Sequence, residues 1–438
     1  MKWNFPAILG AAGLAAALLS GGCTKPSTAP TTTEVMVFEG GYGKDFYEKA
    51  AEEFKANTGK DVKIIGDPRI DLQITPRMQK GDPPDLTYPG WRVKSWQAVE
   101  EGEVEDLTSA LDGPGYGGQG KWRDAFDPAF LKLGQKDGKQ MLMPYFFSVW
   151  GWWYDPELFA KNGWEPPKTY NDLLALCAKI KAAGIAPITY QGKYPDYMTS
   201  GMLLPWILST GGTDAMLKCQ NLEPGAWKDP AVVKAATMIK ELQDMEYFQK
   251  GATALSHTEA QGEFVNGRAA MIPCGTWLYS EMEKEMPAGR KMRMFLPPVA
   301  GDGKGDTTAL MVKIEPWWVP SKGKNKATAI DFFKYLTSPD KAKQFVTEKG
   351  TFMAVKGSLP DTLPEHLQDA AGFYKSSTLL YSSQWREWYP DFYEIVGNIM
   401  TELLNGKITP EQFADKVEAE AEKVRADKRQ TKYTYKLD

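Results

Sequence analysis

The spacing of apolar and polar positions divides the chain into short strands and helices. The apolar run Val35–Phe38 predicts a buried strand. Apolar residues then recur at helical spacing over 46–54, and Gly59 is placed to end that helix. Val62–Ile65 predicts a second strand, and Asp85–Tyr88 begins a third. Strand–helix–strand order at this spacing predicts parallel strands joined by a right-handed crossover.

The same pattern returns later in the chain. We expect a helix that Thr169 caps and Gly184 stops, followed by a strand at Pro187–Tyr190. Further helices are expected at 230–244, 327–337, 392–404 and 410–426. The last of these contains Glu418, Glu420 and Glu422 together with Lys416, Lys423 and Arg425, which predicts a solvated helical face. The fold class is therefore α/β, and the chain is too long for one core.

One segment, Met141–Tyr154, is apolar throughout but contains Gly and Pro. It is too short for a membrane span and too rich in Trp and Tyr, whose rings carry polar groups. We expect a buried strand that leaves one core and enters another. For Trp152, Trp153 and Trp164 we expect positions in a core or at the edge of a lobe.

The first residues predict export from the cytoplasm. Lys2 precedes the apolar run Phe5–Leu19, which ends in small residues and is too short for a span of roughly 20 residues. Cys23 follows directly, which resembles the bacterial lipoprotein signal, although Ser20 occupies the position where that signal usually has Leu. The alternative is an ordinary signal peptide with an incidental cysteine.

These features predict a signal peptide over 1–22 and a lipidated Cys23 that starts a tether over 23–33. The tether is rich in Pro and Thr, and a semi-extended chain at about 3 Å per residue would hold a folded body roughly 30 Å from the membrane. We therefore expect a lipid-anchored protein, on the periplasmic side or the outer face of a cell membrane.

Composition argues against several classes of function. The net charge is −4 and no basic block occurs, which argues against nucleic acid as a partner. Three cysteines follow Cys23, so a fully disulfide-paired scaffold is excluded; Cys177 is expected in a core, and one pair among Cys177, Cys219 and Cys274 stays open. With two histidines and no zinc spacing, no metal site is expected.

Sequence motifs for cofactors and nucleophilic catalysis do not stand out either. Gly40–Gly43 follows a strand but lacks dinucleotide-binding spacing, and no phosphate loop or nucleophile elbow occurs. Asp302–Asp306 is expected to be a turn rather than a calcium loop. His257 and Glu259 are expected at a helix start capped by Thr258, outside any site. No cofactor is expected.

Aromatic residues are the remaining candidates for chemistry. The chain has 15 Trp and 19 Tyr, more than core packing alone requires. Several of them follow strand ends beside polar residues, where ligands of open sheets bind: Trp91 with Arg92, Tyr194 with Gln191 and Lys193, and Trp277. Trp317 lies in another apolar stretch behind Glu315. Rings cover the apolar face of a pyranose and polar side chains bind its hydroxyls. Each ring also has a core-packing interpretation, and Glu315 has a neighbouring Lys as an alternative partner.

Longer motifs carry a resemblance to a known family. Gly81–Asp85, Trp153–Phe159 with Pro167–Thr169, and Phe264–Met271 occur in the order found in the family 1 extracellular solute-binding proteins of carbohydrate ABC importers. The resemblance covers 34–430. It implies a two-lobed periplasmic-binding-protein-like fold of type II with three interlobe crossings and a ligand cleft. It further implies lobe one at 34–147 plus 298–350, and lobe two at 148–294 plus 355–430.

Within that family, Phe38–Gly43, Ile185–Pro195, Asn221–Lys228 and Ile272–Leu278 resemble binding proteins for N-acetylglucosamine and diacetylchitobiose. The resemblance implies a monomer that captures sugar for membrane permease subunits and performs no catalysis. A secreted glycoside hydrolase, and a sensor or adhesin without a transporter, are the alternatives. The candidate ligand-binding residues are Glu39, Tyr42, Trp91, Arg92, Gln191, Lys193, Tyr194, Trp277, Glu315, Trp317 and Trp388.

Overall fold

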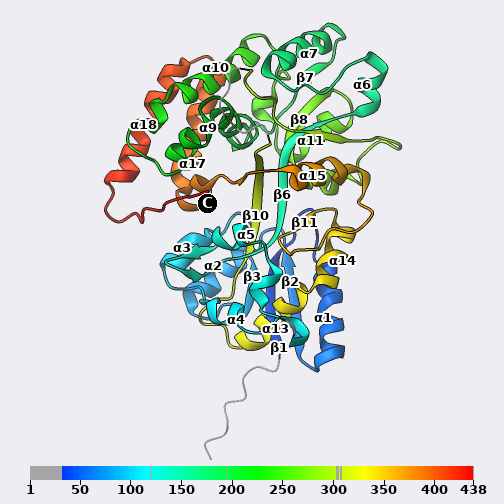
Figure 1. Cartoon of the computed structure of the whole chain (residues 1–438), viewed down its shortest axis with the longest axis vertical. Coiled ribbons are helices and arrows are strands. Elements are labelled where there is room, and N and C mark those ends of the chain that lie inside the picture. The colour runs from blue at the N-terminus through cyan, green and yellow to red at the C-terminus, as the bar shows by residue number, and fades with distance from the viewer. Residues whose placement is uncertain (1–31, 119, 195, 302–304, 306–307, 438) are drawn as a thin grey trace, which may run out of the picture.

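The computed structural model describes residues 32–118, 120–194, 196–301, 305 and 308–437. It has two α/β lobes, one above the other in Figure 1, with the long strands β6 and β10 running between them. The signal peptide, Cys23, most of the tether and most of the 302–306 turn lie outside the described residues. Thr32 and Thr33 were assigned to the tether; they instead form the start of β1, because they pair with Asp61 and Val62.

Lobe one is built on the predicted parallel sheet, with strand order β2-β1-β3. The predicted strands and first helix are confirmed, and Gly59 ends α1 in the left-handed conformation (φ 72°). Helices α1 and α13 pack together over this sheet, while Ile70 and Ile74 pack on Met36. The elements are β1 (Thr32–Phe38), α1 (Asp45–Thr58), β2 (Asp61–Asp67), α2 (Asp71–Lys80), β3 (Leu86–Tyr88), α3 (Ser95–Glu100), α4 (Thr108–Asp112), α5 (Pro128–Lys132), β4 (Gln135–Lys136), β5 (Lys139–Gln140), α13 (Lys326–Leu336) and α14 (Pro339–Lys349).

The apolar segment predicted to join two cores is strand β6 (Met143–Tyr154). Its first half pairs antiparallel with β10 (Leu310–Trp317) and with β11 (Phe352–Met353). Its second half pairs with β8 (Ala269–Gly275) and β9 (Arg293–Phe295). One buried strand therefore belongs to the sheets of both lobes, and Trp152 and Trp153 are core residues as expected.

The other two crossings lie later in the chain than the predicted lobe boundaries. Val299 forms a bridge with Thr169, and the amide of Ala300 donates to Ser209 Oγ at 3.4 Å, so the chain at 298 still contacts lobe two. The chain passes from lobe two to lobe one along β10 instead. After β11, the amide of Lys356 donates to Ala125 O at 2.8 Å, so the chain at 355 still contacts lobe one.

Lobe two combines the parallel pair β7–β8 with many helices. The predicted cap is confirmed, because Thr169 and Asp172 form a capping box at α7. Strand β7 is shorter than expected, since Tyr190 lies beyond it. The elements are α6 (Pro156–Asn162), α7 (Tyr170–Ala182), β7 (Ala186–Ile188), α8 (Asp196–Met198), α9 (Leu204–Gln220), α10 (Pro230–Asp244), α11 (His257–Val265), α12 (Trp277–Met282), α15 (Glu365–Ser376), β12 (Leu380–Tyr381), α16 (Gln384–Trp388), α17 (Pro390–Leu404) and α18 (Pro410–Ala426).

Helix α18 has the predicted bounds, but its face is not uniformly solvated. Glu418 is buried and accepts hydrogen bonds from the amides of Gly225 (2.9 Å) and Trp227 (3.0 Å) and from Arg425 Nη2 (2.7 Å). Burial opposes ionisation of this carboxyl, but these hydrogen bonds outweigh it and lower its pKa. The acid that charge patterning assigned to solvent therefore fastens α18 to the turn before α10.

The three cysteines of the described chain form no disulfide. Cys177, Cys219 and Cys274 are buried and free, and Cys177 lies in the core as expected. Across the described part of the chain, no helix has the length and apolar character needed to cross a membrane.

Candidate functional site

A cavity of about 350 Å³ lies where the two lobes face each other across the β6–β10 pair. Its walls come from segments far apart in sequence: the turn after β1, the turn after β3, strands β6 and β10, the loop after β7, the starts of α11 and α12, and α16. This volume falls in the range of small-molecule sites, which are about 300–1,000 Å³.

Lobe one contributes two turns at the carboxyl ends of its parallel strands. After β1 the chain turns through Glu39–Gly43, and after β3 it turns at Gly90, which has a positive φ of 68°. A Cβ on Gly90 would lie 2.6 Å from the Phe38 ring, so only glycine allows this turn to pack there. The turn delivers Trp91, which is 41% exposed, with the guanidinium of Arg92 4.1 Å from its ring centroid.

Lobe two contributes a set of packed aromatic rings. Trp277 follows β8 and packs edge-on against Trp150, with centroids 5.1 Å apart. Tyr197 packs against Trp150 at 5.4 Å. Trp150 is nearly buried, whereas Trp277 is partly exposed to the cavity, so Trp277 presents the ring surface and Trp150 supports it.

Two neighbouring strands supply the polar floor. Ser148 on β6 is paired with Lys313 on β10, and Glu315 lies two residues further on the same face of β10. Glu315 accepts a hydrogen bond from Tyr88 OH at 3.2 Å and forms an ion pair with Lys313 at 2.8 Å. The neighbouring lysine that was the alternative partner of Glu315 is therefore a partner in the structure, and the carboxylate also lines the cavity.

His257 lines the cavity at the start of α11. Its ring stacks on Tyr194 with centroids 3.7 Å apart, and Nδ1 lies in hydrogen-bonding contact with Tyr197 OH at 2.8 Å. Burial, followed by the positive charges of Lys313, Arg386 and Arg92, lowers its pKa to about 4. The imidazole is therefore neutral at pH 7.

Charges around the cavity are balanced. Glu39, Glu281 and Glu315 face Arg92, Lys313 and Arg386, while His257 is neutral. Burial raises the pKa of Glu281, which accepts a hydrogen bond from Gln261 at 2.6 Å. A cleft with balanced charge, ring faces and hydrogen-bonding heads suits a neutral polyhydroxyl ligand. Among the residues that the structure describes, no cluster of His, Cys, Asp and Glu could hold a metal ion.

Most of the sequence-predicted site residues meet in this cavity. Those that line it are Glu39, Tyr42, Trp91, Arg92, Tyr194, Trp277 and Glu315.

The structure places four other candidates away from the cavity wall, and each has a different reason. Gln191 is fully buried. Lys193 is exposed and pairs with Glu259 at 3.5 Å. Trp317 is fully buried between Tyr88 and Phe333, with both of which it stacks. Trp388 stacks on Tyr433 of the C-terminal segment, with centroids 5.0 Å apart.

Sequence reasoning also missed residues that line the cavity. His257 was expected only at a helix start, and the cap is Ser256 rather than Thr258. Ser148, Trp150 and Lys313 lie on crossing strands, where alternate residues share one face. A period of two along the predicted crossing strand was the available signal for Ser148 and Trp150.

Comparisons with known proteins agree with this geometry. The diacetylchitobiose binding protein NgcE of Streptomyces coelicolor is 28% identical over 340 residues, covering 76% of this chain and 72% of that protein. The multiple sugar-binding protein of Streptococcus mutans is 25% identical over 82% of this chain and 85% of its own length.

Solved structures show the same fold at low identity. A chitin oligosaccharide binding protein superposes with a TM-score of 0.74 and 21% identity, covering 90% of this chain and 99% of that one. The bacterial solute receptor AcbH gives a TM-score of 0.74 at 20% identity, covering 90% and 100%. The family model for bacterial extracellular solute-binding proteins matches residues 40–343. With its two lobes and the cleft between them, the chain belongs to the bacterial extracellular solute-binding proteins.

Proposed function

We propose that this protein captures N-acetylglucosamine or diacetylchitobiose in the interlobe cavity and presents it to the membrane subunits of an ABC importer. The observation that carries the proposal is the cavity wall, where Trp91 of lobe one and Trp277 of lobe two both line one space of about 350 Å³. The names of NgcE and of the chitin oligosaccharide binding protein support the choice of sugar.

The mechanism that follows is capture by closure. Ring faces from both lobes cover the apolar faces of the sugar, and Glu315, Lys313 and Arg92 bind its hydroxyls. Because contacts from both lobes are completed only when the lobes approach, binding favours the closed conformation. Membrane subunits that recognise the closed pair of lobes then receive loaded protein only.

The test is calorimetric titration of the full chain without its signal peptide. We expect N-acetylglucosamine or diacetylchitobiose to bind, and glucose and maltose to bind more weakly. Absence of binding to all four sugars would refute the proposal.

The same sample separates capture from hydrolysis. The cavity does hold Glu281, whose pKa burial raises, together with Glu315, and hydrolases use carboxyl pairs. Glu315 is held by an ion pair with Lys313 and a hydrogen bond from Tyr88, so the two carboxyls differ in environment, and the assay decides between capture and hydrolysis. We expect no monosaccharide to be released from diacetylchitobiose; release at catalytic rates would identify a hydrolase instead.

Anchoring is a separate part of the proposal. The small residues before Cys23 support lipidation of that cysteine and retention of the protein at the membrane. We expect Cys23→Ala to move the protein from the membrane fraction to the soluble extracytoplasmic fraction. If the variant stays in the membrane fraction, the lipid anchor is refuted.

A further inference from the structure

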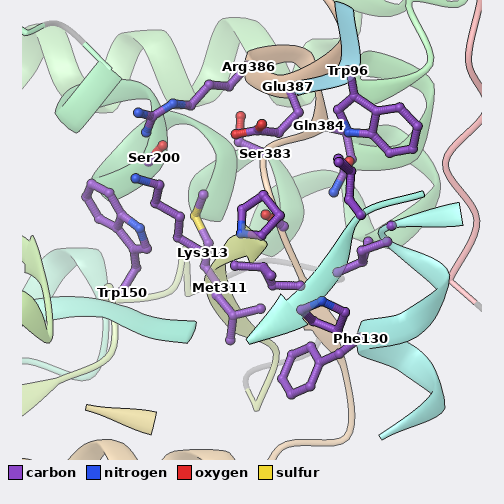
Figure 2. A pocket seen from close by; sticks show the side chains of 18 residues that line it. Trp96, Phe130, Trp150, Ser200, Met311, Lys313, Ser383, Gln384, Arg386 and Glu387 are labelled. Atoms are coloured by element: carbon purple, nitrogen blue, oxygen red, sulfur yellow. The ribbon is translucent and has the colours of Figure 1, made fainter. Parts of the chain in front are cut away.

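A second, smaller cavity of about 50 Å³ adjoins the main one. We call it the side chamber. Trp150, Lys313 and Arg386 line both cavities, so the side chamber opens beside the main site rather than elsewhere on the surface. In Figure 2 these three side chains lie together on one side of the chamber, with Trp96 and Phe130 on the far side.

The size of the side chamber limits what it can hold. A water molecule needs about 10–15 Å³ of such space, so the chamber has room for roughly four groups of that size. The main cavity is about 350 Å³ by the same measure. The chamber is therefore too small for a second sugar ring and large enough for a side group of about four heavy atoms.

The walls of the side chamber divide into an apolar and a polar part. Phe130, Leu142 and Met311 are buried apolar residues, while Ser383, Gln384 and Glu387 bring polar groups. A hydroxymethyl group or a carboxylate could bond to the polar part, but neither brings an apolar group to contact the apolar part. An acetamido group has both an apolar methyl and an amide, and so matches both parts.

Ser383 supplies an independent indication that a polar ligand group belongs here. Its side chain is 7% exposed, and within the described part of the chain its Oγ has no hydrogen-bonding partner. Ser383 precedes α16, yet its hydroxyl does not cap that helix. Buried hydroxyls are nearly always satisfied by protein or water, so an unpaired one lining a chamber beside a ligand site is available to a polar group of the ligand.

We propose that the side chamber receives the acetamido group of the bound sugar and that Ser383 hydrogen-bonds its amide, which makes this chamber the determinant of preference for N-acetylated sugars. This inference rests on the proposed function. The methyl contacts the apolar wall, and Lys313 and Arg386 lie at the side shared with the main cavity, where the pyranose sits.

The experiment uses two substitutions at one residue and pairs of sugars that differ in the acetyl group. Ser383→Leu fills the chamber, and Ser383→Ala removes only the hydroxyl; neither removes a helix cap. Calorimetry then compares N-acetylglucosamine with glucose, and diacetylchitobiose with cellobiose. Melting temperatures of both variants show that they are folded, and Ser383→Ala decides the question if Ser383→Leu does not fold.

For the natural protein we expect at least tenfold tighter binding of the acetylated sugar of each pair. Ser383→Leu should weaken the acetylated sugars at least tenfold and Ser383→Ala severalfold, with the non-acetylated sugars changed less than twofold. Equal losses for both members of a pair, or no loss, would overturn the inference. If the unsubstituted protein binds glucose as tightly as N-acetylglucosamine, the inference about the side chamber is also overturned, while the proposal of sugar capture is not. A protein that binds none of the sugars refutes the proposed function itself.

Discussion

The indole of Trp277 folds back over Gly275 so closely that a Cβ at residue 275 would lie 1.9 Å from ring atom Cζ3. Glycine at the end of β8 is therefore what allows this ring to lie against the strand. The main chain of Gly275 is also used, because Trp153 Nε1 donates to its carbonyl at 3.2 Å. The position of the partly exposed Trp277 ring in the cavity thus depends on the absence of a side chain at Gly275, two residues earlier.

Replacing Gly275 by Ala should displace the Trp277 ring without removing it. A contact of 1.9 Å is impossible for a real Cβ, so the indole must move. We expect sugar affinity to fall about as far as in Trp277→Ala, measured by calorimetry. The double variant Gly275→Ala/Trp277→Ala should be no weaker than Trp277→Ala alone, because both changes act on one ring. Additive losses would show that Gly275 acts independently of Trp277.

Removing the Trp277 ring should cost affinity more than stability. A stacked ring contributes ~1–2 kcal/mol, which corresponds to roughly five- to thirtyfold in affinity. We therefore expect Trp277→Ala to weaken sugar binding about tenfold while the protein stays folded. Trp388→Ala is the matched control, since Trp388 packs on Tyr433 outside the cavity wall. That variant should lower the melting temperature and leave the affinity within about twofold. Unchanged affinity in Trp277→Ala would remove Trp277 from the site.

Glu315 and Glu53 have the same kinds of partner but lie in different parts of the molecule. Each accepts a hydrogen bond from a tyrosine and pairs with a lysine: Glu315 with Tyr88 and Lys313, Glu53 with Tyr335 and Lys341. Only Glu315 lines the cavity.

We expect Glu315→Gln to weaken sugar binding about tenfold, because a charged acceptor is lost where hydroxyls bind. Glu53→Gln should lower the free energy of unfolding, because the ion pair with Lys341 is lost, and should leave sugar affinity unchanged. Calorimetry and denaturant unfolding on both variants measure the two effects. If the two glutamine variants lose affinity equally, the loss at Glu315 comes from general destabilisation rather than from ligand contact.

Elements with regular spacing and clear end signals were predictable from the sequence. The expected helix at 230–244 coincides with α10, which begins at Pro230 directly after the capping residue Asp229. The crossing strand was also predictable, because β6 is apolar on both faces, as a strand shared by two cores must be. The points where the chain changes lobe were not, since Val299 is held by a bridge to Thr169 more than a hundred residues earlier.

The site was predictable where a residue follows a strand end, and less so elsewhere. Trp91 and Trp277 occupy such positions and line the cavity. Trp317 lies in an apolar stretch behind Glu315 and is fully buried, because Tyr88 and Phe333 enclose it. His257 joins the site through its contacts with Tyr194 and Tyr197, which connect separate segments and are not revealed by local sequence.

The buried Glu418 gives a stability prediction far from the cavity. Glu418→Ala would leave the amides of Gly225 and Trp227 without their acceptor and would remove the ion-pair partner of Arg425. We expect the free energy of unfolding to fall by about 2–4 kcal/mol, measured by denaturant unfolding. Glu422→Ala, four residues along the same helix at an exposed position, should change it by less than about 0.5 kcal/mol. Similar effects of the two substitutions would mean that the Glu418 contacts add little.

The two histidines predict a loss of stability in mild acid. Burial, followed for His257 by nearby cations, lowers the pKa of His257 and of His366 from 6.5 to about 4. Between those values the unfolded chain binds a proton that the folded chain does not, so the free energy of unfolding rises with pH there. Each histidine contributes up to about 1.4 kcal/mol per pH unit, and this contribution is lost as pH falls from about 6.5 towards 4. We expect His257→Gln/His366→Gln to show a shallower dependence between pH 5 and 6.5 in denaturant unfolding. Carboxyls with lowered pKa values titrate mainly below this window. If the free energy of unfolding of the double variant depends on pH as steeply as that of the natural protein, both histidines protonate freely in the folded protein.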